Sequence, residues 1–373
     1  MAGGPSETTG SPRTVFRLEE RGFSVDDVID AAEFRGEVRE VRNRLRRGLE
    51  MEEDNEALQA DGQTLQEMAD RFRYERDLIS AEETETWLEE RNLTLEGLTR
   101  YLARLHLAKA DRGTGLPGAP APSEPHGFIA RNTAWGSPPR EALRAELWLS
   151  GEMDEMARAL AWRVVALLDS QESTAPPPAV GDLERASFLQ RCGLSEAEVP
   201  AWLAALARDS SWLDEMLRME RAYQHACEDL LTPERLAREL ASLKMSLTTF
   251  EFEVIDLDTL DAAREAYSCV RRDGLSMEEV ARQGGYPYDR WEAVHEDLSE
   301  ELRRIFLSAN LGEVLAPIPA GEAYQLCRIL EKREPDLRDE EVHRKVERRI
   351  LESWFSDRVA RHIHWAIVPA GGA

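Results

Sequence analysis

The sequence is poor in cysteine and in basic residues, and it contains no long apolar run. Its 373 residues include four cysteines, and no two of them form a Cys-x-x-Cys pair. We therefore expect buried thiols rather than a disulfide framework. Lys and Arg number 47 against 72 Asp and Glu, which gives a net charge of −25. Nucleic acids and anionic membranes are bound through basic surfaces, so we expect neither as a partner.

Several familiar motifs are also missing. The first residues lack the basic and apolar regions of a secretory signal, and no apolar run approaches the ~18 residues of a membrane span. We therefore expect a cytoplasmic protein. The sequence has no P-loop, no G-x-S-x-G and no H-E-x-x-H. His362 and His364 form the one close histidine pair, without carboxylates or cysteines at ligand spacing. Neither a cofactor nor a metal is implied.

Composition and periodicity divide the chain into segments. Residues 1–13 are rich in Gly, Ser, Thr and Pro, and we expect them to be disordered. Residues 14–245 have helical periodicity, interrupted by Pro- and Gly-rich linkers at 111–139 and 173–182. Within this region four arginines recur every three or four residues, which predicts an ion-paired, solvated stripe on one helix face: Arg35, Arg39, Arg42 and Arg46.

One phrase occurs twice in the helical region. Ser80 is followed by Glu83 and then by Trp87-Leu88, and Ser195 is followed by Glu198 and then by Trp202-Leu203. A Ser with an acid three residues later is the pattern of a capping box at a helix start. The repetition predicts two similar helical hairpins, which could pack against each other, although capping alone could also produce so short a match.

The periodicity changes near Leu247. Residues 249–258 alternate and are rich in β-formers, which predicts a strand. Three short helices follow, at 260–270, 277–283 and 298–306, and residues 314–335 are typical of two strands around a Gly turn. Residues 246–335 therefore predict a small α+β domain. The remaining segment, 336–373, contains a long helix with a broad apolar face, which we expect to pack back on the helical domain.

Residues 247–335 resemble the parvulin-type peptidyl-prolyl isomerase domain. The resemblance rests on Gly312-Glu313-Val314 with Pro317-Ile318, on the run AYQLCRI that starts at Ala323, and on charged residues that end at Pro335. The order of helical blocks, small domain and final helix also resembles the SurA- and PrsA-type foldase chaperones. The resemblance implies an α+β, mostly helical protein. Its SurA-like helical domain would be built from both chain ends, beside a small parvulin-like domain.

Measured against this resemblance, the pocket is degenerate. Active parvulins pair two strand histidines with a nearby Cys or Asp, and surround the proline ring with apolar side chains. Gln325 stands at one histidine position, Glu253 falls near the other, and the loop that supplies the Cys or Asp is shortened after Ala281. The apolar wall is kept, and aromatic residues follow in a loop beside it. The resemblance thus implies these peptide-binding residues: Glu253, Tyr286, Tyr288, Trp291, Leu298, Leu302, Leu307, Tyr324 and Gln325.

An apolar wall without the polar groups indicates binding without efficient turnover, because a prolyl isomerase must stabilise the twisted amide. The leading hypothesis is a chaperone-like protein that binds a peptide or an unfolded polypeptide client through an inactive parvulin domain, and that assists maturation of a precursor peptide. The alternatives are an active prolyl isomerase that uses Gln325 and Glu253, a scaffold that docks modification enzymes, and a domain kept for structure alone.

Overall fold

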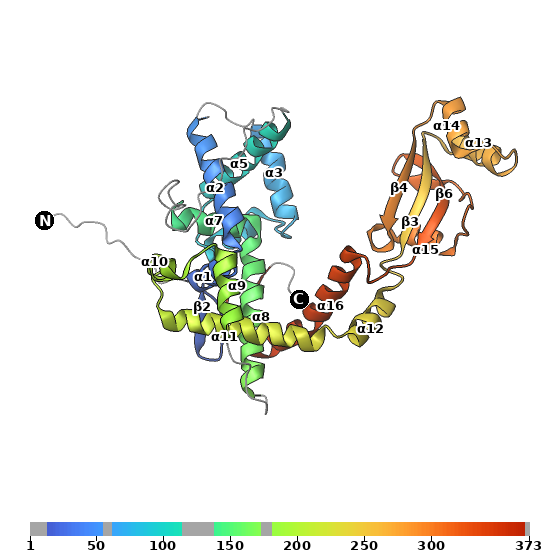
Figure 1. Ribbon diagram of the computed structural model, residues 1–373. Coiled ribbons are helices and arrows are strands. Elements are labelled where there is room, and N and C mark those ends of the chain that lie inside the picture. Colours follow the sequence, from blue (N-terminus) through green and yellow to red (C-terminus); the bar gives the residue numbers. More distant parts are fainter. Residues whose placement is uncertain (1–12, 55–61, 114–137, 173–180, 370–373) are drawn as a thin grey trace. The chain divides into compact units, whose positions relative to one another are not determined.

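The computed structural model describes residues 13–54, 62–113, 138–172 and 181–369, and it divides into two compact units (Figure 1). The helical unit comprises Met1–Ala226 and Phe355–Ala373, and the inserted unit comprises Cys227–Trp354. Both crossings between the units lie inside helices, α11 (Ser210–Leu230) and α16 (Glu340–His362). The expected mixed, mostly helical α+β class is confirmed, as is a helical body built from both chain ends.

Three expected features concern residues outside the described ranges. The disordered start at 1–13 lies there except for its last residue, as do most of the linkers at 111–139 and 173–182. In the described ranges, none of the helices combines the length and the apolar character that a membrane crossing requires.

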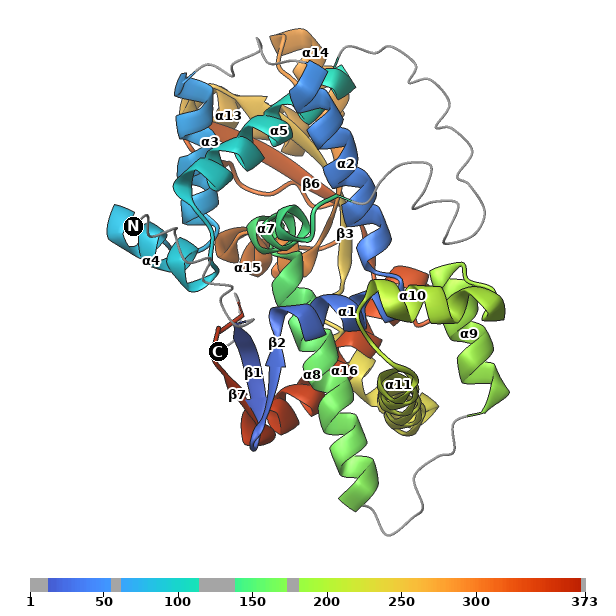
Figure 2. The same cartoon turned by 90° about the vertical axis from the view of Figure 1, so that its left-hand side faces the viewer.

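The helical unit contains a small sheet and a set of helices (Figure 2). Besides α11 and the end of α16, its elements are β1 (Thr14–Leu18), β2 (Arg21–Ser24), α1 (Val25–Arg35), α2 (Val38–Asp54), α3 (Gly62–Tyr74), α4 (Ala81–Glu90), α5 (Leu95–Gly113), α7 (Arg140–Ser150), α8 (Glu152–Glu172), α9 (Asp182–Cys192), η1 (Glu196–Glu198), α10 (Val199–Ala205) and β7 (Ile363–Trp365).

The sheet corrects the expectation of a purely helical region from residue 14 onward. Its order is β2-β1-β7, and both pairings are antiparallel. The fully buried Phe16 stacks on Phe23 at 4.7 Å between ring centroids and meets the edge of Trp365 at 5.2 Å. Because the second partner of β1, the strand β7, lies at the other end of the chain, no local pattern predicts the pairing of β1 with β7.

The arginine stripe does not lie on one helix. Gly36 adopts φ +77° and ends α1, so Arg35 belongs to α1 and the other three arginines belong to α2. A left-handed residue that ends a helix favours Gly, which lacks the Cβ that would clash. Arg35 is buried and bonds Glu37, whereas Arg42 bonds Glu33. The ion pairing is as expected, but the solvated stripe is wrong for Arg35.

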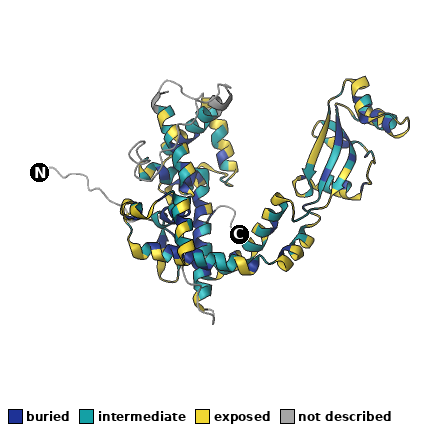
Figure 3. Cartoon of the chain, in the orientation of Figure 1, coloured by how far each residue is buried: buried dark blue, intermediate teal, exposed yellow. Residues whose placement is uncertain are grey.

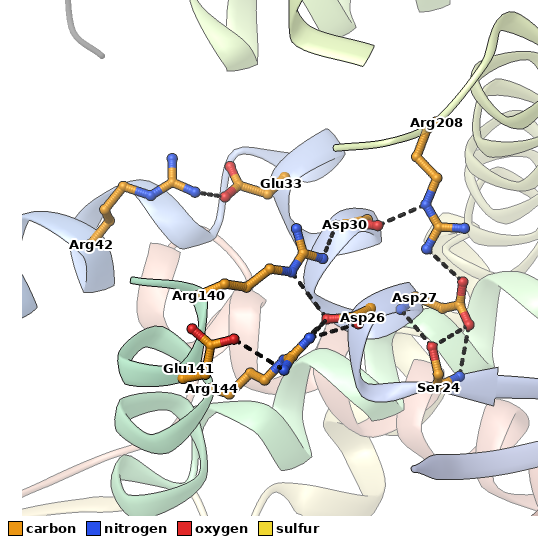
Figure 4. A network of polar contacts seen from close by, with 10 residues as sticks. All are labelled: Ser24, Asp26, Asp27, Asp30, Glu33, Arg42, Arg140, Glu141, Arg144 and Arg208. Atoms are coloured by element: carbon orange, nitrogen blue, oxygen red, sulfur yellow. Dashed lines mark hydrogen bonds and ion pairs between the residues drawn. The ribbon is translucent and has the colours of Figure 1, made fainter. Parts of the chain in front are cut away.

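Acidic side chains of α1 hold three segments together (Figure 4). Ser24 caps the helix and forms a capping box with Asp27. Asp30 is buried and accepts hydrogen bonds from Arg140 and Arg208, and Arg208 also reaches Asp27 at 2.7 Å. Burial raises the pKa of Asp30 above its usual range, although the two arginines oppose the shift. These bonds join α1 to α7 and to the loop after α10.

The predicted repeat is present and extends further than the sequence phrase. Both capping boxes form, Ser80 with Glu83 and Ser195 with Glu198. Each copy also has a left-handed non-glycine residue twelve positions after its Ser, Asn92 at φ 55° and Ala207 at φ 53°. A second helix follows in each copy, α5 or α11.

A preceding helix completes each copy of the repeat. Phe72 of α3 meets Trp87 edge-on at 5.6 Å, and Phe188 of α9 meets Trp202 at 5.2 Å. The first copy packs on α2 and α7 through α5, and the second packs on α1 through α9. Each copy therefore contributes its helices to a body that also contains α1, α2 and α7.

The inserted unit contains a four-stranded antiparallel sheet with helices. Besides parts of α11 and α16, its elements are α12 (Pro233–Leu243), β3 (Thr249–Leu257), α13 (Leu260–Arg271), α14 (Met277–Gly284), β4 (Tyr288–Val294), η2 (His295–Asp297), α15 (Glu300–Ser308), β5 (Ile318–Ala320) and β6 (Ala323–Arg333). The sheet order is β4-β3-β6-β5. The predicted strand at 249–258, the three short helices and the two final strands are confirmed.

The prediction of a loop at 286–291 is wrong, because β4 occupies most of it and pairs with β3 over seven residue pairs. The sequence YDRWEAV has one β-branched residue, so it gives a weak strand signal of its own. It becomes a strand because β3 offers it a regular edge.

Apolar clusters cover both faces of this sheet. The α15 face includes Phe250, Val254, Cys327 and Ile329, which pack with Phe306 of α15. The opposite face, which we call the α13 face, includes Ile255, Leu257 and Leu326, which pack with residues of α13 and α14. Because side chains alternate along a strand, even-numbered residues of β3 point to the α15 face and odd-numbered ones to the α13 face.

The helix α16 packs in both units. Its buried Val346 joins Leu236 of α12 and Leu247 in an apolar cluster of the inserted unit. Further along, Phe355 is fully buried in the helical unit, where it stacks on Trp162 at 4.9 Å and approaches Tyr223 at 5.3 Å. The last turns of α16, and not the whole helix, therefore supply the expected return to the helical body.

We expect Phe355→Ala to destabilise the helical unit by about 3–5 kcal/mol, because it removes a buried ring and leaves a cavity beside Trp162. Urea unfolding, followed through the 5-fluorotryptophan resonances of Trp162 and Trp202, measures the loss. Glu352→Ala, at an exposed position one turn earlier on the same helix, is the matched control and should change the stability by less than about 0.5 kcal/mol. A loss as small for Phe355→Ala would contradict the role of this ring.

Candidate functional site

Glu253 is the most buried acidic or basic side chain of the inserted unit, with 3% of its surface exposed. Arg328 on β6 donates two hydrogen bonds to its Oε2 atom, at 2.9 and 2.5 Å. Its Oε1 atom accepts bonds from the Tyr288 hydroxyl at 2.8 Å and from Arg290 on β4 at 3.2 Å. Burial, together with this carboxylate, raises the pKa of Tyr288. Both oxygens of Glu253 are therefore occupied by protein donors.

Gln325 has a different partner. Its Nε2 atom donates to Asp256 on β3 at 2.9 Å, and the two residues are direct cross-strand neighbours. The register pairs Glu253 with Arg328 instead. Glu253 and Asp256 are three residues apart on one strand, so they point to opposite faces.

The structure does not bring the two expected histidine positions together. Gln325 lies on the α15 face with Asp256, and Glu253 lies on the α13 face with Ile255. The expectation that Gln325 and Glu253 act as a pair is therefore corrected: the residue opposite Gln325 is Asp256. Sequence reasoning missed Asp256, Arg290 and Arg328, because only the strand register shows which side chains meet.

The other expected peptide-binding residues also divide between the faces. Tyr286, Tyr288 and Tyr324 pack, half-buried, against the α13-face cluster. Leu298 is buried in the α15-face cluster, and Leu302 packs against it. Trp291 lies opposite Phe252 on the α15 face and exposes 57% of its surface. Leu307, on α15, is exposed.

The expected apolar wall is therefore largely core. Leu298 and Leu302 support Phe250 and Phe306 rather than standing open to solvent. The exposed apolar residues expected at this wall are Leu307 on α15 and Trp291 on β4, the strand that sequence reasoning missed. Figure 3 shows that β4 is largely exposed.

Two further ionisable groups lie on the α15 face. Cys327 is buried in the cluster, and burial raises the pKa of its thiol to about 12, so it carries no thiolate at neutral pH. His295 lies at the end of β4, where its Nε2 atom is buried without a hydrogen-bond partner among the described residues. Burial lowers the pKa of His295, and the nearby Arg303 contributes.

Among the described residues, His, Cys, Asp and Glu side chains do not gather in groups of three or more that could hold an ion. Of the close histidine pair, His362 is the last residue of α16 and His364 is the middle residue of β7.

Comparison with known proteins gives similarity to solved structures alone. No family model and no curated protein sequence matches the chain. Among solved structures, the peptidylprolyl isomerase PrsA from Bacillus anthracis is 11% identical, and the match covers 56% of this chain and 96% of that one, with a TM-score of 0.28. PrsA from Bacillus cereus is 11% identical over 61% and 88% of the two chains, with a TM-score of 0.34. The foldase PrsA from Streptococcus pneumoniae is 13% identical over 57% and 83%, with a TM-score of 0.24.

We expect Glu253→Gln to destabilise the inserted unit by about 1.5–3 kcal/mol, because Arg328 loses a charged hydrogen-bond partner inside the sheet. The 5-fluorotryptophan resonance of Trp291 reports unfolding of this unit. Glu265→Gln, at an exposed position on α13, is the matched control and should be neutral. Unchanged stability of Glu253→Gln would show that the cluster of Glu253, Arg290 and Arg328 is not structural.

We expect the stability of the inserted unit to rise with pH in the window just below the ordinary histidine pKa of about 6.5. In that window the unfolded chain binds a proton at His295 that the folded chain does not, because folding lowers the pKa of His295. The contribution is fully present above this window and is lost as the pH falls. Urea unfolding of Trp291 at several pH values measures the slope. His295→Asn should flatten it, whereas His364→Asn should leave it unchanged.

Proposed function

We propose that this protein is a chaperone-like polypeptide holder, whose inserted unit binds extended segments of an unfolded client without efficient prolyl isomerisation. The observation that carries the proposal is the separation of Gln325 from Glu253. Where the resemblance to parvulins places a catalytic pair, each side chain is bound to a different structural partner on a different face.

The chemistry of isomerisation supports the same reading. A catalyst must stabilise the twisted amide more than either planar form. On the α15 face, Gln325 stands at an expected histidine position, and it and Asp256 bond each other. The Cys327 thiol on the same face is protonated. What this face offers a polypeptide is apolar area at Trp291.

The charge of the chain favours one class of client. A net charge of −25 attracts basic segments and repels acidic ones. We therefore propose a basic or neutral unfolded polypeptide as the client, with a precursor peptide awaiting modification as the specific case.

Two measurements on the full chain test the proposal. Reduced, carboxamidomethylated lysozyme is a permanently unfolded basic polypeptide, and fluorescence anisotropy of its labelled form should show binding that weakens with salt. Exchange spectroscopy of a labelled Ala-Pro peptide with catalytic amounts of the protein should show no cis–trans cross peaks.

The outcomes separate the alternatives. Cross peaks that disappear in Gln325→Ala would make the protein a prolyl isomerase and overturn the proposal of a holder. Absence of lysozyme binding at low salt would overturn polypeptide binding itself, and would leave the scaffold for modification enzymes as the better hypothesis.

A further inference from the structure

The strand β4 leaves one side of its backbone without a strand partner, because it is the outer strand in the order β4-β3-β6-β5. At its two ends, His295 N–H donates to Thr248 at 2.8 Å and Asp256 N–H donates to Pro287 at 3.2 Å. Hydrogen bonding alternates along an antiparallel pair. The residues between these bonds that direct N–H and C=O away from β3 are therefore Tyr288, Arg290, Glu292 and Val294.

This edge lacks three of the features by which proteins protect exposed strands, although it carries the charged residues Asp289, Arg290 and Glu292. Proline, bulges and short length prevent an edge from pairing with another chain. The opposite edge, β5, has three residues with Pro319 in the middle. In contrast, β4 has seven residues without proline, and its pairing with β3 runs without a register shift. It is the longest edge strand in the described part of the chain.

The side chains of β4 on the α15 face indicate what could lie beside it. Trp291 exposes 57% of its surface where a protected edge would carry a charge. Asp289 is exposed two positions earlier on the same face. On the other face, Arg290 and Glu292 are already held by Glu253 and Arg333. An added strand would thus meet an apolar ring and a carboxylate two residues apart.

We infer that β4 captures an extended segment of the client as a fifth, antiparallel strand. An apolar side chain of that segment lies beside Trp291, and a Lys or Arg lies beside Asp289. This inference rests on the proposed function and names the surface and the sequence pattern that it uses. Backbone hydrogen bonds supply affinity for many sequences, and the alternating side chains supply preference.

Amide hydrogen exchange of the full chain tests the inference directly. In the free protein the amides of Asp289, Trp291 and Ala293 are bonded to β3 and should exchange slowly, whereas those of Tyr288, Arg290, Glu292 and Val294 should exchange fast. Saturation with the unfolded lysozyme derivative should slow these four selectively. Binding of lysozyme with all four still fast would overturn the inference and leave the proposed function intact. Slow exchange of all four before any client is added would show that a second copy covers the edge, which also overturns it.

Two variants at one position separate backbone from side chain. Glu292→Pro removes an outward N–H without removing a bond to β3, so the unit should stay folded, with a dispersed spectrum. It should bind lysozyme at least about tenfold more weakly, because one bond is lost and the proline ring blocks the edge. Glu292→Ala keeps the N–H and should bind as the unaltered protein does. Equal binding of a folded Glu292→Pro variant would overturn the inference.

Methylated peptides test the strand direction. The probe is the capped peptide Ser-Thr-Phe-Thr-Lys-Thr-Ser, with Phe placed for Trp291 and Lys for Asp289. In an antiparallel pairing the threonine nitrogens point to β4, whereas those of Phe and Lys point away. N-methylation of the threonines should abolish the amide protection, and N-methylation of Phe and Lys should leave it. The reverse result would overturn the antiparallel arrangement.

Discussion

The pairing of β1 with β7 is the constraint on which the rest of this structure depends. It joins the first described residues to the last, and it encloses Phe16 between Phe23 and Trp365. Phe355 reinforces the same closure from α16. The entropy cost of closing a loop grows only with the logarithm of its length. The chain can therefore hold a whole folded unit between these contacts at little more cost than a long loop, provided that the unit is stable by itself.

The inserted unit meets that condition through its central strand. β3 is paired on both sides and carries an apolar cluster on each face. It also positions the two polar pairs, Glu253 with Arg328 and Asp256 with Gln325. Because every neighbour of β3 is fixed by this one register, the site residues cannot shift without opening a core. The outer backbone of β4 lies beyond both clusters and remains available.

Sequence periodicity predicted the elements of this unit better than it predicted their neighbours. The strand β3 and three helices follow from local alternation and capping, which the sequence contains. β4 has only one β-branched residue, Val294, and its pairing with β3 makes it a strand. The same limit affected the site. The spacing of Glu253 and Asp256 on one strand already places them on opposite faces, whereas only the strand register shows that Gln325 lies opposite Asp256. The repeat is the converse case. Short local signals, a capping box and a Trp, predicted two similar hairpins, and the structure extends the correspondence to Phe72 and Phe188 in the preceding helices.

The distribution of charge connects the fold to the class of client that we propose. Several arginines are buried or form ion pairs inside the structure. Arg35 and Arg91 are buried, and Arg163 and Arg328 pair with buried carboxylates. Carboxylates are buried as well, namely Asp30, Glu146, Asp154, Glu220 and Glu253, so the surface that a partner meets keeps an acidic excess close to the overall ratio of 47 to 72. At physiological salt such a field reaches only about 8 Å. It can gather basic segments near the surface, but it does not fix their register. The register of a bound segment must come from directional contacts such as backbone hydrogen bonds. In the inserted unit, the outer backbone of β4 offers a regular row of N–H and C=O groups for such bonds.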